Sequence, residues 1–383
     1  MKGIPLAWLQ LMHEKRRLVA AISGITFAVI LMLVQLGFEQ ALFTSVTLFY
    51  SHLNCELVIL SPLFQSMNAI ATFSHRRILE ARGFEGVESA HALYLGPAKW
   101  KNPVTHQARY IFVIGMEPVA GVFDIPELNQ QIRKLEQPGA ALFDVLSRPE
   151  FGPIQDLLRQ HNQVATEVNG SWTHIAGGFP LGTSFVADAT LVTSDENFKR
   201  LSPSREFGSV DLGVVKLAPG VDAIAVRDRM RAAFPQDVRV VTKQEMLDIE
   251  HDYWAKNTPI GFVFRMGLGM GILVGMIVVY QILYSDVTDH LAEYATLKAM
   301  GYSDGALGKV VIQQALILSA FGFVPGALLS EAVFVIAHRA TLLPLQFSVV
   351  RAVVVYALTA GMCAGSGLLA VRRLKLANPA DIF

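Results

Sequence analysis

The chain has 383 residues and a formal net charge of +0; 52% of its residues are hydrophobic and only 17% are charged. Soluble domains carry roughly 25% charged residues, so the deficit indicates a protein that is partly embedded in a membrane. The balanced charge argues against nucleic-acid binding, which calls for a clear excess of basic residues.

Residues 1–17 form a short segment in front of the first long apolar run. The segment has apolar residues such as Leu6, Trp8 and Leu9 and ends in the basic cluster Lys15-Arg16-Arg17. This pattern is typical of an interfacial helix that lies on the inner leaflet. A simple cytoplasmic extension of the first membrane helix fits equally well.

Four apolar runs are long enough to cross a membrane, because a hydrocarbon core of about 30 Å needs about 20 residues of helix. The first run exceeds the usual length of a signal-peptide core, so we expect it to be retained. The predicted fold class is therefore an α-helical membrane domain of four helices in a one-plus-three arrangement, with a large α/β domain inserted between helices 1 and 2. The predicted spans are residues 18–38, 260–283, 310–336 and 349–371.

Basic residues at both ends of the chain predict its orientation, because Lys and Arg favour the cytoplasmic side. Lys15, Arg16 and Arg17 precede the first span, and Arg372, Arg373 and Lys375 follow the last one. Both termini are then cytoplasmic, and the protein is a multi-pass protein of the inner (cytoplasmic) membrane. The inserted domain 39–259 and the short loop 337–348 lie outside, whereas the loop 284–309 and the tail 372–383 lie in the cytoplasm.

The inserted domain 39–259 has the pattern of a mixed α/β fold. Short apolar runs at 57–60 and 110–114 predict strands, and segments 74–82 and 127–136 have helical spacing with charged faces. The predicted outer domain therefore alternates between the two kinds of element.

The clearest local unit of this domain is 212–241, which predicts a strand, a helix and a second strand on a small sheet. Asp222 is the expected cap of the helix, and Thr242 with Glu245 forms a capping box for the next one. Tyr253 and Trp254 follow just before the second span and suit the outer membrane interface.

Motifs of catalysis and of metal binding are missing from the sequence. Gly308-Lys309-Val310 lacks the upstream glycine and the following Ser or Thr of a phosphate-binding loop. There is no His-Glu-x-x-His, no cysteine pair at metal spacing and no nucleophile elbow. We therefore expect a non-catalytic chain with no cofactor of its own.

The strongest local signal is the predicted cytoplasmic loop, from Ser285 to Tyr302. Its pattern is that of an amphipathic helix that ends at Gly301. A short helix at the end of a membrane span can transmit force to a protein that docks below it. The broad face of this helix comprises Leu291, Tyr294, Ala295, Leu297 and Lys298.

This loop resembles that of the FtsX/MacB family of ABC-transporter permeases, which carry Glu, a small residue, Leu, a basic residue, Ala, an apolar residue and Gly in this order. Asp289-His290 stands where the family usually has Glu-Arg. The segment 372–382 resembles the segment with which members of this family end. The amino-acid sequence of the loop is most similar to that of the DevC branch of the family. The matching residues of the loop are Glu293, Tyr294, Ala295, Leu297, Lys298, Ala299, Met300 and Gly301.

The resemblance implies a homodimeric export permease in contact with membrane lipid. A separate ABC ATPase subunit, which carries the ATP and Mg, would bind the loop, and a HlyD-type periplasmic adaptor would bind the outer domain and lead to a TolC-like duct. For the DevC branch the cargo is a glycolipid. The ATPase-coupling residues that the resemblance implies are Asp289, His290, Glu293, Tyr294, Leu297, Lys298 and Gly301.

Gly267, Gly271 and Gly275 repeat at every fourth position of the second span. Small residues at this spacing let two helices approach closely. The stripe predicts a seam between the two copies of a homodimer, and packing within one copy is the alternative.

Three other functions remain open at this stage. The same fold serves permeases that activate a cell-wall hydrolase and permeases that extract lipoproteins. A membrane receptor with an outer sensor domain is the third, although no cytoplasmic segment here is long enough for an output domain.

Overall fold

The computed structural model describes residues 15–161, 163–290, 293, 296, 300 and 302–376. The segment 1–14, which holds most of the predicted interfacial helix, and residues 377–383 of the predicted tail lie outside this part of the chain. The chain divides into a helical unit, Met1–Ala41 with Pro259–Phe383, and an α/β unit, Leu42–Thr258. Each unit is described here by itself.

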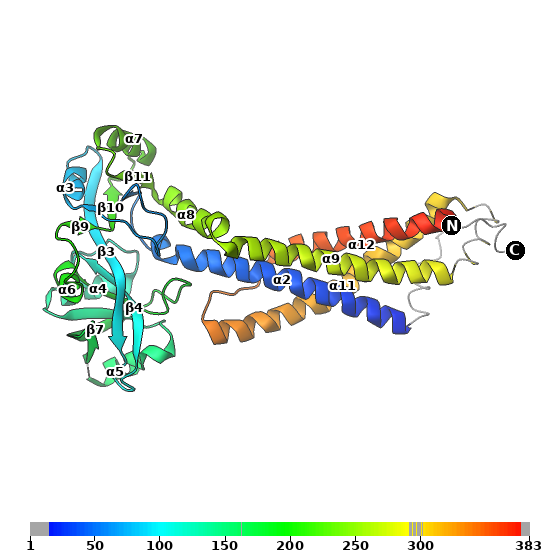
Figure 1. Cartoon of the computed structure of the whole chain (residues 1–383), viewed down its shortest axis with the longest axis horizontal. Coiled ribbons are helices and arrows are strands. Elements are labelled where there is room, and N and C mark those ends of the chain that lie inside the picture. The colour runs from blue at the N-terminus through cyan, green and yellow to red at the C-terminus, as the bar shows by residue number, and fades with distance from the viewer. Residues whose placement is uncertain are drawn as a thin grey trace. The chain divides into compact units, whose positions relative to one another are not determined.

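The helical unit contains four helices that are long and apolar enough to cross a membrane, by length and composition (Figure 1). All four predicted apolar runs are thus helical. Many large apolar side chains of these helices are exposed, among them Phe262, Met266 and Leu328, as suits a surface in contact with lipid. The helices are α2 (Lys15–Ser51), α9 (Pro259–Asp289), α11 (Asp304–Thr341) and α12 (Val349–Leu376).

Glycines let the helices of this unit pack closely. A Cβ atom at Gly322 of α11 would lie 2.5 Å from Cγ2 of Ile25 on α2, and one at Gly326 would lie 2.6 Å from Cγ1 of Val29. A buried hydroxyl adds a polar tie, because Ser366 Oγ on α12 donates to the Met276 carbonyl on α9 at 2.9 Å. Close approach through small residues and buried polar ties both stabilise helix pairs in a membrane.

We expect Gly322→Leu to separate α11 from α2 and to destabilise the helical unit, because overpacking a well-packed site costs about 1–3 kcal/mol. The measurement is thermal unfolding of the purified protein in detergent. Gly361→Leu is the matched control, because a Cβ atom at Gly361 of α12 meets nothing within 4 Å. Equal melting temperatures for the two variants would contradict this packing.

The α/β unit combines a large sheet, a two-stranded sheet and short helices (Figure 1). Its helices are α3 (Arg76–Arg82), α4 (Pro126–Gln131), η1 (Ile132–Glu136), η2 (Pro149–Phe151), α5 (Ile154–His161), α6 (Asp195–Leu201), α7 (Ala223–Ala233), α8 (Lys243–Asp252) and the π-helix η3 (Tyr253–Asn257). Its strands are β1 (Leu57–Leu60), β2 (Phe73–Ser74), β3 (Val87–Lys101), β4 (Ala108–Met116), β5 (Ala140–Asp144), β6 (Val164–Val168), β7 (Ser171–Phe179), β8 (Thr190–Ser194), β9 (Ser209–Val210), β10 (Leu212–Leu217) and β11 (Arg239–Thr242).

The main sheet has nine strands in the order β11-β1-β10-β3-β4-β8-β5-β7-β6. Most neighbours are antiparallel, whereas β4 with β8 and β5 with β7 are parallel. Trp100 of β3 also pairs with Val168 of β6, which closes the strands from β3 to β6 into a circuit. The expectation of a small sheet is wrong, because β3 is long enough to pair with β10, β4 and β6 along its length.

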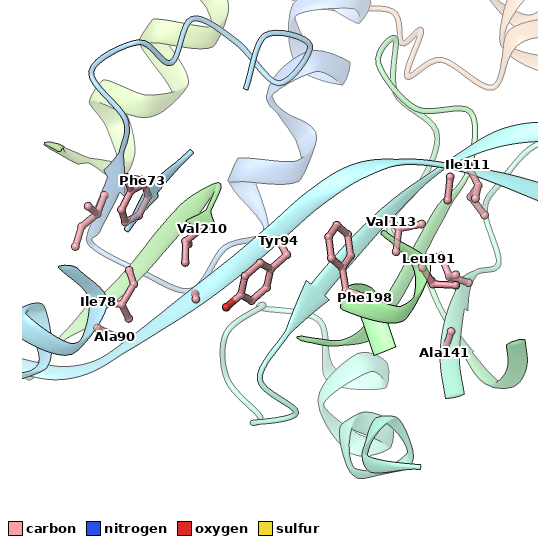
Figure 2. Packing of buried hydrophobic residues seen from close by; sticks show 14 of the residues in the cluster. Phe73, Ile78, Ala90, Tyr94, Ile111, Val113, Ala141, Leu191, Phe198 and Val210 are labelled. Carbon is pink, nitrogen blue, oxygen red and sulfur yellow. The ribbon is translucent and has the colours of Figure 1, made fainter. Parts of the chain in front are cut away.

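Alternating side chains of the sheet supply two hydrophobic cores, one on each face. On β1, for example, Leu57 and Ile59 belong to one core, whereas Val58 and Leu60 belong to the other. Figure 2 shows part of the first core, where Tyr94 of β3 and Phe198 of α6 face each other with ring centroids 6.0 Å apart.

The helix caps predicted in 212–245 are confirmed. The Asp222 side chain accepts a hydrogen bond from the Ile224 N–H at the start of α7. At α8, Thr242 and Glu245 form the reciprocal capping box. Such caps satisfy N–H groups that have no partner inside the helix, and each is worth about 1 kcal/mol.

The Trp254 side chain is buried within the α/β unit, and its place relative to the membrane stays a prediction. It is 6% exposed, and its Nε1–H donates to Glu250 Oε1 at 2.9 Å. Glu250 is fully buried and also accepts hydrogen bonds from Tyr50 Oη at 3.2 Å and from the Met67 N–H at 3.0 Å. Through this carboxylate, α8 is hydrogen-bonded to three other segments: the end of α2, the loop that follows β1, and η3.

Candidate coupling site

The end of α9 meets the beginning of α2 through an ion pair. Arg17 Nη2 contacts Asp289 Oδ2, and Ser285 Oγ donates to the same oxygen at 3.4 Å. The side chains of Arg17 and Asp289 are 39% and 46% exposed. Exposed ion pairs add only about 0–1 kcal/mol of stability, so this pair orients the two helix ends rather than holding the fold together.

A second, better buried contact joins the same end of α9 to α11. Gln314 of α11 is fully buried, and its Nε2 donates to Asp286 Oδ2 at 3.3 Å. His290 Nδ1 lies 3.6 Å from Asp286 Oδ1, one helical turn away, and both side chains are less than 15% exposed. Asp286 is therefore the residue through which His290 and α11 are linked.

An apolar cluster supports these polar contacts. Val287 of α9, Leu307 and Val311 of α11 and Val371 of α12 are all buried against one another. The cluster and the polar contacts together join α2, α9, α11 and α12. We call Arg17, Asp286, Asp289, His290 and Gln314 the coupling cluster.

Two of the predicted coupling residues, Asp289 and His290, take part in the coupling cluster. Glu293 is helical and exposed. The other predicted residues, Tyr294, Leu297, Lys298 and Gly301, lie outside the described residues, so their role stays a prediction.

Sequence reasoning missed three members of the cluster. The sequence analysis used Arg17 only to predict the orientation of the chain in the membrane. Gln314 lies in an apolar run that contains no motif. Asp286 carried a usable signal, because it stands four residues before His290 and such pairs share one face of a helix.

The three glycines of α9 pack against helices of the same chain. A Cβ atom at Gly267 would lie 2.6 Å from Gln35 Cδ, and one at Gly275 would lie 2.6 Å from Met362 Sδ; Gly271 lies against Met32. These contacts correspond to packing within one copy. The seam between two copies stays a prediction.

The coupling cluster consists of charged and amide side chains that contact one another across helices. Within the described residues, no group of three or more His, Cys, Asp and Glu is placed to hold a metal ion.

Exchanging the charges of Arg17 and Asp289 tests the role of their ion pair. We expect Arg17→Glu and Asp289→Arg each to reduce ATPase stimulation several-fold, because each single change places like charges face to face. The double variant restores the pair and should recover most of the activity. Equal loss in the double variant would show that the two residues act separately.

Four helices that can cross a membrane and a separate α/β unit define the class of this chain, a multi-pass membrane protein. Its C-terminal part can be placed more closely, because residues 265–379 match the model of the FtsX-like permease C-terminal domain. This domain covers most of α9 and all of α11, and it includes four of the five members of the coupling cluster. No curated protein matches the sequence.

Two solved structures are similar in part. The periplasmic region of MacB from Actinobacillus actinomycetemcomitans is 7% identical, over 51% of this chain and 92% of that one, with a TM-score of 0.37. The extracellular domain of the noncanonic ABC-type transporter YknZ from Gram-positive bacteria is 12% identical, over 49% and 98%, with a TM-score of 0.32. At these scores neither likeness carries a conclusion.

Proposed function

We propose that this chain is the non-catalytic permease subunit of an ABC exporter of the FtsX/MacB type. The match of residues 265–379 to the FtsX-like permease domain carries the proposal. The coupling cluster supports it, because most of the cluster lies inside this domain at a helix end that a partner can push.

In the proposed mechanism a separate ATPase, with ATP and Mg, docks on the loop 284–309 in the cytoplasm. Its closure moves the end of α9, and the Arg17–Asp289 pair passes this movement to α2. α2 runs from Lys15 to Ser51 and contributes residues to both units, so it offers a continuous path into the α/β unit. A helix transmits an axial push because its backbone hydrogen bonds run along its length.

The proposed complex is a homodimer in the inner membrane, with the termini in the cytoplasm and the α/β unit in the periplasm. A HlyD-type adaptor binds the α/β unit and connects it to a TolC-like duct. The cargo is a lipid or another hydrophobic molecule, a glycolipid if the likeness to the DevC branch extends to the substrate.

The test is gentle extraction of the chain from native membranes, followed by identification of the proteins that co-purify. An ATPase together with a HlyD-type adaptor is the expected result. An ATPase with a cell-wall hydrolase would assign the chain to signalling, and an ATPase with a soluble lipoprotein carrier would assign it to lipoprotein extraction. A kinase without an ATPase would overturn the proposal.

A further inference from the structure

One edge of strand β7 is open over its last residues. β6 pairs with β7 only as far as Val164 opposite Ile175, whereas β5 continues to pair up to Asp144 opposite Phe179. Residues 176–179 therefore have a strand on one side and, within the described chain, none on the other. An open edge exposes main-chain groups that another extended chain can pair with.

Side chains occupy this edge in place of a strand. Lys134 Nζ donates to the Ala176 carbonyl at 2.8 Å, and Gln131 Nε2 donates to the Gly178 carbonyl at 2.8 Å. The register with β5 shifts at Ala176, so alternation alone does not fix the direction of these carbonyls. Both nevertheless face α4 and η1, the two elements that carry the donors. Both donors end flexible side chains that can move aside.

A cavity of about 480 Å³ lies along the same edge. It opens between two groups of helices. α4 and η1 contribute apolar residues to the core on one face of the sheet, and α5 contributes residues to the core on the other face. Gln155, Leu158 and Arg159 of α5 line one wall, and Glu127, Gln131 and Lys134 line the opposite wall.

Two consecutive glycines on this edge let side chains of the same chain lie directly against the strand. A Cβ atom at Gly177 would lie 1.9 Å from Gln131 Oε1, and one at Gly178 would lie 2.4 Å from Val145 Cγ1. Glycine inside a strand often marks a place where a ligand or a second backbone approaches closely.

The charges of the residues that line the cavity indicate which kind of ligand it would bind. Lys134 and Arg159 supply two cations, and Glu127 supplies one carboxylate, so the lining is positive on balance. Arg159 has Asp156 3.7 Å away, but both side chains are about 70% exposed, and such a pair is weak. The occupant should therefore carry acidic side chains.

We propose that this cavity binds an extended, acidic peptide segment of a partner protein, which adds as a strand to the open edge of β7 at Ala176–Phe179. Main-chain hydrogen bonds to the edge supply affinity in this mode, and side chains supply selectivity. The incoming N–H groups replace Lys134 and Gln131 on the two carbonyls. The two displaced side chains then meet the acidic residues of the peptide.

The experiment uses the full chain in nanodiscs and a fluorescent peptide of about six alternating Thr and Glu residues, a usual strand length. We expect saturable binding, and we expect hydrogen exchange of the Gly178 amide to slow when the peptide is bound. Methylation of alternate peptide amides leaves one hydrogen-bonding edge intact and should not weaken binding. Methylation of every amide should weaken it about tenfold, as the loss of two main-chain hydrogen bonds predicts.

A variant pair tests the role of charge. Lys134→Glu should weaken binding about fivefold, as expected when a cation facing an acidic ligand is reversed. Arg133→Glu is the matched control, because Arg133 is the exposed neighbour that does not line the cavity. No saturable binding, equal binding of the fully methylated peptide, or equal weakening by both variants would overturn the proposal.

Discussion

The Leu297→Asp variant should lose docking of the ATPase subunit by at least about tenfold while the chain stays folded. On the predicted loop helix Leu297 lies on the face that meets the partner, and burying an unpaired carboxylate in such a contact is costly. The measurement is co-purification of the ATPase with the variant, together with ATPase stimulation.

Thr288→Asp is the control for this variant. Thr288 is exposed near the end of α9, and its hydroxyl donates to the Tyr284 carbonyl of its own helix. Thr288→Asp adds the same charge within the loop but outside the broad face of Leu291, Tyr294, Ala295, Leu297 and Lys298, so it should weaken docking much less than Leu297→Asp does. Normal docking of the Leu297→Asp variant would contradict the assignment of this face.

Glu250→Leu should destabilise the α/β unit by about 3–5 kcal/mol, because each buried donor left without an acceptor costs about 1–3 kcal/mol. The change leaves the Tyr50 hydroxyl, the Trp254 indole N–H and the Met67 N–H without their acceptor. Glu250→Gln keeps an acceptor oxygen and the side-chain volume, so it should cost much less. Thermal unfolding followed by tryptophan fluorescence compares the two variants, and equal losses would contradict this explanation.

The effect of Glu250 should also depend on pH. Burial raises the pKa of its carboxyl above the ordinary value of 4.5, against the hydrogen bonds from Trp254, Met67 and Tyr50, which lower it. A raised pKa in the folded state means that the folded protein holds the proton more tightly than the unfolded protein does. The stabilisation is complete below the unfolded pKa and is lost as the pH rises through the folded pKa. The stability of the wild type relative to Glu250→Gln should therefore fall as the pH rises from about 4.5, and a constant difference would contradict the raised pKa.

The apolar runs predicted the four long helices because length and hydropathy suffice for that purpose. The caps at Asp222 and Thr242 were equally readable, since a cap depends on a few neighbouring residues. Local patterns of this kind need no knowledge of the rest of the fold.

The sheet could not be read in the same way. β3 is its longest strand, yet its sequence contains Gly96 and Pro97, which usually argue against a strand. Pro97 is tolerated because it falls between the pairing with β10, which ends at Leu93, and the contact of Trp100 with β6. Such tolerance depends on partners far away in the sequence.

Buried polar contacts were the other features that no pattern revealed. Glu250 reads as an ordinary charge on the polar face of α8, and only its distant partners Tyr50 and Met67 explain its burial. At the candidate coupling site the family resemblance implied a role for Asp289 and His290, and that role stays a prediction. The contact of Asp289 with Arg17, and that of Asp286 with Gln314, depend on helices far away in the chain.

The central claim is that ATP binding by the ATPase subunit docked at the coupling site moves the α/β unit. The most direct measurement is hydrogen exchange of the native complex in nanodiscs, with ATP and with ADP, followed in α8 and η3. We expect exchange in Lys243–Asn257 to differ between the two nucleotides, and we expect the single Arg17→Glu variant to abolish the difference. Unchanged exchange in this segment while ATP is hydrolysed at the normal rate would contradict the claim.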